Sequence, residues 1–471
     1  MAALARAHPA SSGLPVNALI VGLGREGLAL ARYLGERGDA VTVAEGRSAA
    51  GLGADAERLA ALGARLIAGD DHPDLAGYDI LYLNPAVSKA APVVHDALVR
   101  GIPVSSLTDL FFRACLAPIA GVTGSNGKTT TTTLLGEMLK AAGIVAHVGG
   151  NIGRPLLNEA ATMDPGDWVV LEMSSFQLEW LKASPRVAVI TNLTPNHLDR
   201  HHTMDEYAAA KVPIVAHQCP EDVAILNAED PYASWFARQA GGRVLYFSLE
   251  MSPLDGAALE GEMLAIRRDG LSEPVCARTE LRVPGRHNLA NALAAIAAAD
   301  RMGVPAVAMR EAIGAFDGVP HRLQLVRTLD GVRYYDDSIA TSPERALAAL
   351  AAIERPVVLI LGGHDKDLPW DGLCREAVRR CRAVLLLGEA ESLIAAHFAE
   401  ALRHSADGLL LPTAVLRCGD LQRAVAAAAR LAISGDAVLL SPACASYDQF
   451  RDFEERGARF RQFVGSIDGR R

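Results

Sequence analysis

A glycine-rich segment with one lysine and three threonines carries the strongest chemical signal in the chain. It reads GVTGSNGKTT from Gly121 to Thr130, after an apolar run typical of a strand and before a run typical of a helix. Backbone N–H groups at a helix N-terminus bind phosphate, and the helix dipole favours its negative charge. Lys128 would reach the β- and γ-phosphates of a nucleotide, and the Thr129 hydroxyl would bind Mg²⁺. The strict GxxxxGK[ST] spacing is missed by one place, at Val122, so the prediction depends on the strand–loop–helix context.

Three further side chains could assist such a site. Glu172 ends the apolar run VVLE, His197 follows the apolar run VAVI, and Lys211 ends the helical segment EYAAAK. Taken alone, each has an ordinary structural explanation. A glutamate at a strand end or a lysine on a helix is usually solvated, and a loop histidine can simply satisfy a carbonyl.

A second glycine motif, GLGREG, follows the first apolar run of the chain. Gly22, Gly24 and Gly27, with Glu45 at the end of the next strand, fit a Rossmann fingerprint, in which the acidic residue holds a ribose hydroxyl. This motif indicates an alternative of another class, an NAD-dependent dehydrogenase. That alternative leaves the downstream GSNGKTT loop unexplained.

The elements that must position these residues alternate between strand and helix, which predicts an α/β fold. A chain of 471 residues is long enough for about three domains. We expect a Rossmann-like domain at residues 1–113, a central P-loop-type ATPase sheet at 114–320 with a β-rich stretch near its end, and a second Rossmann-like domain at 321–471. The Pro- and Gly-containing segment around Gly318 marks the last boundary.

Composition narrows the class of protein. A formal net charge of −9 gives no general attraction to nucleic acid or to an anionic membrane. The 7 cysteines form no CxxC pair, which favours reduced thiols in the cytoplasm. No signal-peptide pattern or run of about 18 apolar residues is present. We therefore expect a cytoplasmic protein with no membrane insertion and no nucleic-acid partner.

The order of motifs along the chain resembles that of the Mur ligases. The resemblance covers the chain from about Ala18, and its landmarks beside the GSNGKTT loop are GGNIGRPL from Gly149, LEMSSFQLE from Leu171, TNLTPNHLDRH from Thr191, PGRHNLANALAA from Pro284, HRLQ from His321, DDSIATSPERA from Asp336, LGGHDKDL from Leu361 and SPACASYDQFRDFEERG from Ser441. The SSFQLE and SPACASYDQFRDFEERG segments resemble the glutamate-adding members of the family.

This resemblance implies a monomeric enzyme that uses ATP and Mg²⁺ to add D-glutamate to UDP-N-acetylmuramoyl-L-alanine through an acyl phosphate, in peptidoglycan precursor synthesis. Addition of L-glutamate is the alternative within the same chemistry. Folate polyglutamylation, from the same superfamily, would lack the first domain. A nucleotide-binding module without catalysis would have no chemical need for Lys128, Glu172, His197 and Lys211 together.

The resemblance also implies roles for individual residues. The catalytic set is Lys128, His197, Lys211 and Arg322. ATP contacts are expected from Gly124, Ser125, Asn126, Gly127, Lys128, Thr129, Thr130, Asn288, Asn291, Arg322 and Asp337. The UDP-substrate would contact Gly24, Glu45, Arg47, Asn151 and Ser174, and glutamate would contact Thr341, Lys366, Ser446 and Phe453. Metal ligands would be Thr129, Glu172, His197 and Lys211, the last as a carbamate formed with CO₂, which requires a neutral amine and a lowered pKa.

The expected glutamate site departs from the resemblance at one position. Ile339 stands where the best-known D-glutamate-adding members carry a lysine, so a cation is missing from a site for a dicarboxylate. Either Arg345 or Ser338 supplies another donor, or glutamate is held differently.

Overall fold

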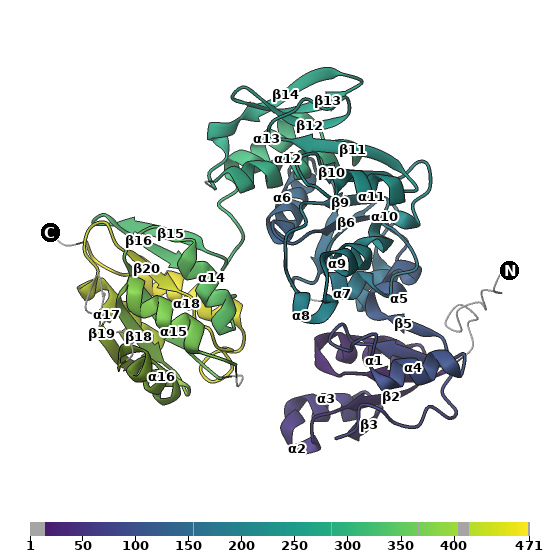
Figure 1. Cartoon of the computed structure of the whole chain (residues 1–471), viewed down its shortest axis with the longest axis horizontal. Helices are drawn as coiled ribbons and strands as arrows, with labels where there is room; N and C mark the ends of the chain where they lie inside the picture. Colours follow the sequence, from purple (N-terminus) through teal and green to yellow (C-terminus); the bar gives the residue numbers. More distant parts are fainter. Residues whose placement is uncertain (1–14, 154, 284, 366–367, 404–413, 470–471) are drawn as a thin grey trace. The chain divides into compact units, whose positions relative to one another are not determined.

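The computed structural model describes residues 15–153, 155–283, 285–365, 368–403 and 414–469. Its strands form three sheets, of five, nine and six strands (Figure 1). This confirms the predicted α/β architecture with three sheets. Contacts divide the chain into two compact units, Met1–Phe316 and Asp317–Arg471. The boundary predicted at residue 113, between the first two domains, stays a prediction.

The first sheet is parallel throughout, in the order β3-β2-β1-β4-β5, as in a Rossmann fold. Its strands are β1 Asn17–Val21, β2 Ala40–Glu45, β3 Arg65–Ala68, β4 Ile80–Leu83 and β5 Val104–Ser106, and its helices are α1 Gly24–Glu36, α2 Ala49–Leu52, α3 Ala54–Ala61, α4 Pro92–Val99 and α5 Leu107–Ala114. Apolar residues of β1 alternate between two separate buried clusters, one on each face of the sheet. Burial on both faces explains the continuous apolar run ALIV.

The central sheet has the order β14-β13-β12-β11-β10-β9-β6-β8-β7. Its strands are β6 Ile119–Thr123, β7 Ala146–Gly150, β8 Trp168–Glu172, β9 Val187–Ile190, β10 Val223–Asn227, β11 Arg243–Ser248, β12 Gly256–Glu260, β13 Met263–Arg268 and β14 Leu271–Ala277. Strands β6 to β12 pair in parallel, whereas β12, β13 and β14 pair antiparallel and form the predicted β-rich stretch.

The helices of this part are α6 Lys128–Ala141, α7 Ser175–Leu178, α8 Leu198–His201, α9 Met204–Lys211, α10 Pro213–Ala216, α11 Ala233–Gln239, α12 Arg286–Arg301 and α13 Ala306–Ala315, with short 3₁₀ turns at Leu157–Thr162 and Arg278–Glu280. Strands β9, β6 and β8 are neighbours, and all three run in the same direction. The segments that follow them therefore meet at one edge of the sheet, which brings the glycine-rich loop, Glu172 and the segment of His197 to one place.

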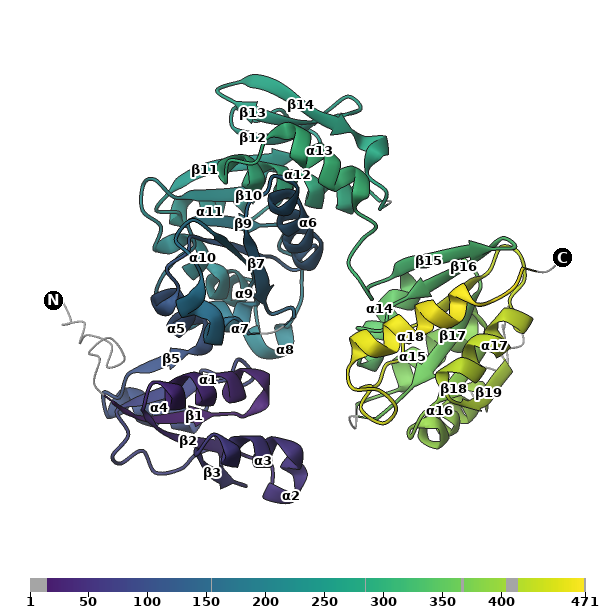
Figure 2. The same ribbon diagram turned by 180° about the vertical axis from the view of Figure 1, so that it is seen from behind.

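The third sheet has the order β15-β16-β20-β17-β18-β19, with β15 antiparallel at its edge. Its strands are β15 Gln324–Leu329, β16 Val332–Asp336, β17 Val357–Gly362, β18 Cys381–Leu387, β19 Ala414–Gly419 and β20 Ala437–Leu440, and its helices are α14 Pro343–Ala351, α15 Asp371–Arg380, α16 Glu391–Arg403, α17 Leu421–Leu431 and α18 Phe453–Gly465. One core cluster joins α14, α15 and α16 to one face of this sheet, and another joins α17 and α18 to the other face (Figures 1 and 2).

Across the described ranges, no helix combines the length and the apolar character needed to cross a membrane.

Candidate active site

The glycine-rich loop between β6 and α6 requires its glycines. Gly124 has a φ of +143° and Gly127 a φ of +81°, both in the region that side chains disfavour. A Cβ on Gly124 would collide with the Thr191 hydroxyl, and a Cβ on Gly127 would collide with the Asn291 amide. The backbone therefore comes close to its neighbours, and the loop leads into the N-terminus of α6, a position that favours phosphate. This cradle fits a nucleotide.

Two lysine ammonium groups converge on this loop. Lys128 Nζ donates to the carbonyls of Gly124 and Ser125, at 3.0 and 2.9 Å. Lys211 Nζ lies 3.4 Å from the same Gly124 carbonyl and 3.2 Å from Thr123 Oγ1. The structure thus brings together two predicted catalytic residues that are far apart in sequence.

Lys211 is completely buried, and its amine lies 4.6 Å from the centre of the Tyr207 ring. Within the described residues it forms no ion pair with a carboxylate. Burial, and secondly the charge of Lys128, lowers the pKa of Lys211 well below its usual value. A buried amine with a lowered pKa is neutral more often than a surface lysine, and neutrality is what carbamate formation requires.

Thr129 and Glu172 form the oxygen-rich part of the site. Thr129 Oγ1 donates to Glu172 Oε2 at 2.7 Å, and Asn151 Nδ2 donates to Glu172 Oε1 at 2.7 Å. Both Thr129 and Glu172 are buried. Mg²⁺ prefers hard oxygen ligands, so a hydroxyl and a carboxylate held side by side at the phosphate loop fit this ion. Asn151, predicted to contact the UDP-sugar, also orients the carboxylate.

His197 has a φ of +55° and lies in an aromatic group with Phe176 and Tyr207. Its ring meets Phe176 edge-on, with the centroids 5.0 Å apart. In the part of the chain that the structure covers, no three His, Cys, Asp or Glu side chains gather closely enough to hold a metal ion. Only two of the four predicted metal ligands, Glu172 and His197, are residues of these four types. The role of His197 as a ligand therefore stays a prediction.

The remaining loop residues are held by neighbouring segments. Ser125 Oγ donates to the Thr194 carbonyl at 2.9 Å and lies 3.2 Å from the Tyr207 hydroxyl. The Asn126 N–H donates to the Asn192 side chain at 3.0 Å. Thr130 follows Thr129 in the first turn of α6. These contacts fix the shape of the loop. Its contacts with ATP stay a prediction.

Asn291 and Asn288 lie one turn apart on α12, and Asn291 Nδ2 donates to Asn288 Oδ1 at 3.3 Å. Asn291 is buried directly against Gly127. The structure therefore brings this predicted ATP pair to the phosphate loop.

In the C-terminal unit, Arg322 and Asp337 are neighbours in the turns around β15 and β16. The Leu323 N–H and the Ser441 hydroxyl donate to the Asp337 carboxylate, at 3.1 and 2.7 Å. Burial raises the pKa of Asp337 to about 7, although these hydrogen bonds and the charge of Arg322 act in the opposite direction.

Three residues predicted to bind glutamate follow β16 and β20: Thr341 and Ser446 lie on loops, and Phe453 begins α18. Ser446 is buried, Thr341 is partly exposed, and the Phe453 ring meets His321 edge-on at 6.2 Å. Lys366, the fourth, lies outside the described residues.

Of the predicted UDP-substrate residues, Glu45 and Arg47 are paired, with Arg47 Nε 3.1 Å from Glu45 Oε1. Glu45 also accepts the Leu23 N–H at 3.0 Å, and therefore holds the GLG turn in which Gly24 has a φ of +42°. Ser174 caps α7, because its hydroxyl accepts the Gln177 N–H at 3.2 Å. The structure gives these residues local roles, and their contact with a substrate stays a prediction.

Three family profiles match successive parts of the chain. The Mur ligase MurD-like N-terminal domain matches residues 16–106, the Mur ligase middle domain matches 122–299, and the Mur ligase glutamate ligase domain matches 321–444. A protein from Symbiobacterium thermophilum named UDP-N-acetylmuramoylalanine–D-glutamate ligase is 44% identical over 96% of this chain and 99% of its own. The chain belongs to the Mur ligase family.

Another relative in this family carries the same name. The protein from Pelotomaculum thermopropionicum is 41% identical over 95% of this chain and 97% of its own. Among solved structures, the UDP-N-acetylmuramate–alanine ligase of Thermotoga maritima aligns with a TM-score of 0.54, over 96% of this chain and 99% of its own, at 20% identity. At that identity the structural likeness supports the Mur ligase fold alone.

Membership of the Mur ligase family decides between the fold-level alternatives. The first sheet is Rossmann-like in topology, yet it matches the N-terminal domain of a ligase family, which argues against the NAD-dependent dehydrogenase. The same match argues against folate polyglutamylation, which would lack this domain.

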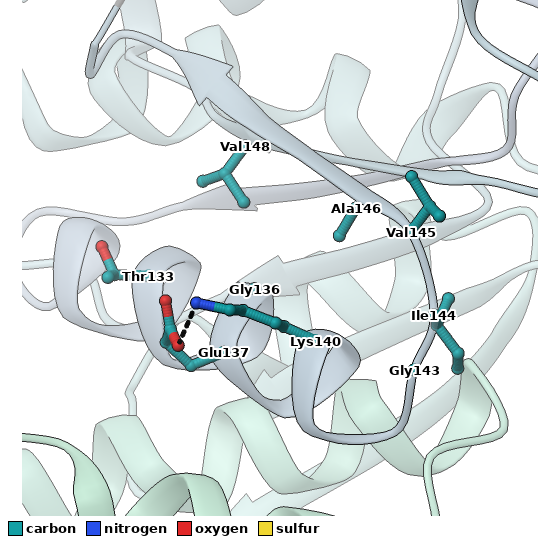
Figure 3. A pocket seen from close by; sticks show the side chains of 9 residues that line it. All are labelled: Thr133, Gly136, Glu137, Lys140, Gly143, Ile144, Val145, Ala146 and Val148. Atoms are coloured by element: carbon teal, nitrogen blue, oxygen red, sulfur yellow. Dashed lines mark ion pairs between the residues drawn. The ribbon is translucent and has the colours of Figure 1, made fainter.

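A cavity of about 440 Å³ lies on the same helix as the phosphate loop but away from it, between α6 and the edge strand β7 (Figure 3). Its lining residues are Thr133, Gly136, Glu137, Lys140, Gly143, Ile144, Val145, Ala146 and Val148. None of them is a predicted site residue, so the Mur ligase site is not this cavity.

Tyr207 was not among the predicted site residues, although its hydroxyl touches Ser125 and its ring covers the Lys211 amine. A signal was available, because Tyr207 and Lys211 are four residues apart on a helix and therefore share a face. Arg456 was also overlooked, although it lies in the FEERG segment. No local pattern distinguishes its buried guanidinium from a solvated one.

Proposed function

We propose that this Mur ligase joins D-glutamate to UDP-N-acetylmuramoyl-L-alanine with hydrolysis of ATP to ADP and phosphate, in peptidoglycan precursor synthesis. The observation that carries the proposal is the 44% identity, across nearly the whole of both chains, to a protein named for this reaction. Lys128 lies at the phosphate loop together with the buried Thr129, Glu172 and Lys211, and this arrangement supports the same chemistry.

The reaction has two steps. A carboxylate oxygen of the UDP-linked substrate attacks the γ-phosphorus of ATP, and ADP leaves. The glutamate amine then attacks the acyl carbon, loses a proton to solvent or buffer, and inorganic phosphate leaves with the electron pair of the broken C–O bond. Little covalent chemistry falls to the protein, which positions the groups and stabilises charge on the phosphoryl oxygens.

Each residue at the loop has a part in that stabilisation. Lys128 would leave the carbonyls of Gly124 and Ser125 for the phosphate oxygens when nucleotide binds, since a phosphate is the stronger acceptor for an ammonium. Thr129 and Glu172 would hold Mg²⁺, which neutralises charge between the phosphates. Asn151 keeps the Glu172 carboxylate in a fixed orientation.

Lys211 would act as a carbamate. Its neutral amine would attack CO₂, forming an N–C bond and releasing a proton, and the product carries a negative oxygen group. This change places an anion beside the Lys128 ammonium, so that the two groups attract each other. A carbamate also offers Mg²⁺ the oxygen that an amine lacks.

The UDP-sugar substrate and ATP indicate the cell compartment in which the reaction takes place. UDP-sugars and ATP are cytoplasmic compounds, and we therefore infer a cytoplasmic enzyme that acts without a nucleic-acid partner.

The deciding experiment measures ADP release by the full chain with ATP, Mg²⁺, UDP-N-acetylmuramoyl-L-alanine and either enantiomer of glutamate. The expected result is ADP release that depends on D-glutamate, with an amide product of the corresponding mass. Product from L-glutamate alone would replace the D assignment with the L alternative. No product from either enantiomer, with a folded protein that binds ATP, would overturn the proposed function.

A further inference from the structure

The loops after β16 and β20 are joined through the buried side chain of Arg456. Ser338 Oγ donates to the Phe453 carbonyl at 2.8 Å, and Arg456 Nε donates to Ser338 Oγ at 3.0 Å. The Ala443 N–H donates to the Ala340 carbonyl at 2.9 Å. The loops that carry Thr341 and Ser446 are therefore held together as one body with Phe453, the first residue of α18.

These loops also lie at a point of the sheet where ligands commonly bind. Strands β16 and β20 are parallel neighbours, but the helices that follow them, α14 and α18, pack on opposite faces. In open α/β sheets, ligands bind beyond the carboxyl ends of strands where the connections separate in this way.

Glutamate carries two carboxylates, so its site needs cations with free donors. Arg456 does not provide them. Its side chain is fully buried, and the five N–H groups of a guanidinium are matched by five hydrogen bonds, to Ser338 Oγ, the Ser338 carbonyl, the Cys444 carbonyl twice and the Ala445 carbonyl. Ser338 is not available either, because its hydroxyl already joins Phe453 and Arg456.

Arg345 differs from Arg456 in this respect. It lies in the first turn of α14, next to the same loop, and its side chain is exposed. Among the residues that the structure describes, its side chain makes one hydrogen bond, from Nη1 to the Ile339 carbonyl at 3.4 Å. The helix dipole disfavours a cation in a first turn, so the guanidinium gains nothing from the dipole at this position.

We propose that Arg345 is a carboxylate-binding residue of the glutamate site. The long bond to Ile339 directs the guanidinium along the loop that carries Thr341, and its remaining N–H groups can bind one carboxylate in a bidentate manner. The inference rests on the proposed function, and it assigns to Arg345 the binding energy and the selectivity for one of the two carboxylates of the amino acid.

The test compares the KM for D-glutamate in the wild type, Arg345→Ala, Arg345→Lys and Arg355→Ala. Arg355 is the matched control, since it belongs to the same unit and its Nη1 likewise makes one 3.4 Å bond, to the Gly435 carbonyl. Loss of a charge-assisted contact should raise the KM for D-glutamate in Arg345→Ala by about tenfold or more. We expect partial recovery in Arg345→Lys, no change in Arg355→Ala, and unchanged KM values for ATP and the UDP-substrate.

A second measurement separates carboxylate binding from a structural role. D-glutamine and the α-amide of D-glutamate each replace one carboxylate by a neutral amide. In Arg345→Ala the preference for D-glutamate should fall against one of these two compounds and stay unchanged against the other. Equal KM values in Arg345→Ala and the wild type, or unchanged preferences against both amides, would overturn the inference. Failure of the proposed function is distinguishable, because the wild type would then form no amide from D-glutamate.

Discussion

The Thr129 hydroxyl donates a 2.7 Å hydrogen bond to the Glu172 carboxylate, although 43 residues separate the two in sequence. The other carboxylate oxygen accepts the Asn151 amide, so Glu172 has one fixed orientation. Thr129 lies in the first turn of α6 and Glu172 ends β8, so both residues lie at the same edge of the central sheet.

Glu172→Gln should raise the Mg²⁺ concentration needed for half-maximal activity by about tenfold or more, because the charge-assisted contact with the ion is lost. Glutamine keeps the size of the side chain and can still accept hydrogen bonds from Thr129 or Asn151. The measurement is a Mg²⁺ titration of ADP release at saturating substrates. Thr129→Ser, which keeps the hydroxyl, serves as the control, and an unchanged Mg²⁺ requirement in Glu172→Gln would contradict the assignment.

Lys128→Ala should lower the rate of ADP release by about 100-fold or more, as expected when one group that stabilises transition-state charge is removed. The protein should remain folded, because this side chain bonds to loop carbonyls and does not belong to the apolar core. Lys140→Ala is the matched control on the same helix, where Lys140 pairs only loosely with Glu137 at 3.8 Å (Figure 3). Comparable rates for the two variants would remove the phosphate-loop assignment.

Lys211→Ala should be nearly inactive and should recover part of its activity when a small carboxylate such as acetate or formate is added. The cavity left by the buried side chain can admit such an anion, which would replace the oxygen of the carbamate. The measurement is ADP release against carboxylate concentration, with chloride at equal ionic strength as the control. Full activity without any additive would exclude the carbamate.

Lys211→Met should raise the melting temperature in CO₂-free buffer at neutral pH, and the gain should shrink as the pH rises. The pKa of Lys211 is lowered in the folded state, so between that value and the ordinary 10.5 only the unfolded chain binds the proton. Wild-type stability therefore increases with pH through this window, while the methionine variant lacks that increase. Thermal unfolding at pH 7 and pH 10 checks the prediction, and an equal gain at both would contradict it.

Asp337→Asn should remove a loss of stability that the wild type shows between about pH 4 and pH 7. The folded pKa of Asp337 is raised to about 7, so in this window the folded protein holds a proton that the unfolded chain has released. Wild-type stability thus falls with rising pH, by at most about 1.4 kcal/mol per unit. Asparagine can still bond to Ser441 and to the Leu323 N–H. Melting curves of both proteins at pH 5 and pH 7.5 test this, and parallel pH dependences would show that Asp337 titrates normally.

Most of the strands and the phosphate loop could be predicted from the sequence. Short apolar runs became the buried strands β1, β6, β8 and β9, because strands covered by helices on both faces are apolar throughout. The glycines at 124 and 127 were predicted to form a loop, and both have positive φ values. The edge strands β7, β15 and β19 were not predicted, since short and partly exposed strands lack a continuous apolar run.

The environment of the charged residues could not be predicted from the sequence, because it depends on the tertiary structure. From its sequence, EYAAAK predicts a solvated helix lysine, yet Lys211 is buried beside Thr123, which is 88 residues away. Ser338 and Arg345 were equivalent candidates as donors, until Arg456 was found to use the first of them. Periodicity reports which face of an element is buried, but the partners that bury a charge come from other segments. The pKa of a buried lysine therefore depends on which strands pair and which loops meet at the edge of a sheet. The same holds for the donors that an arginine keeps free.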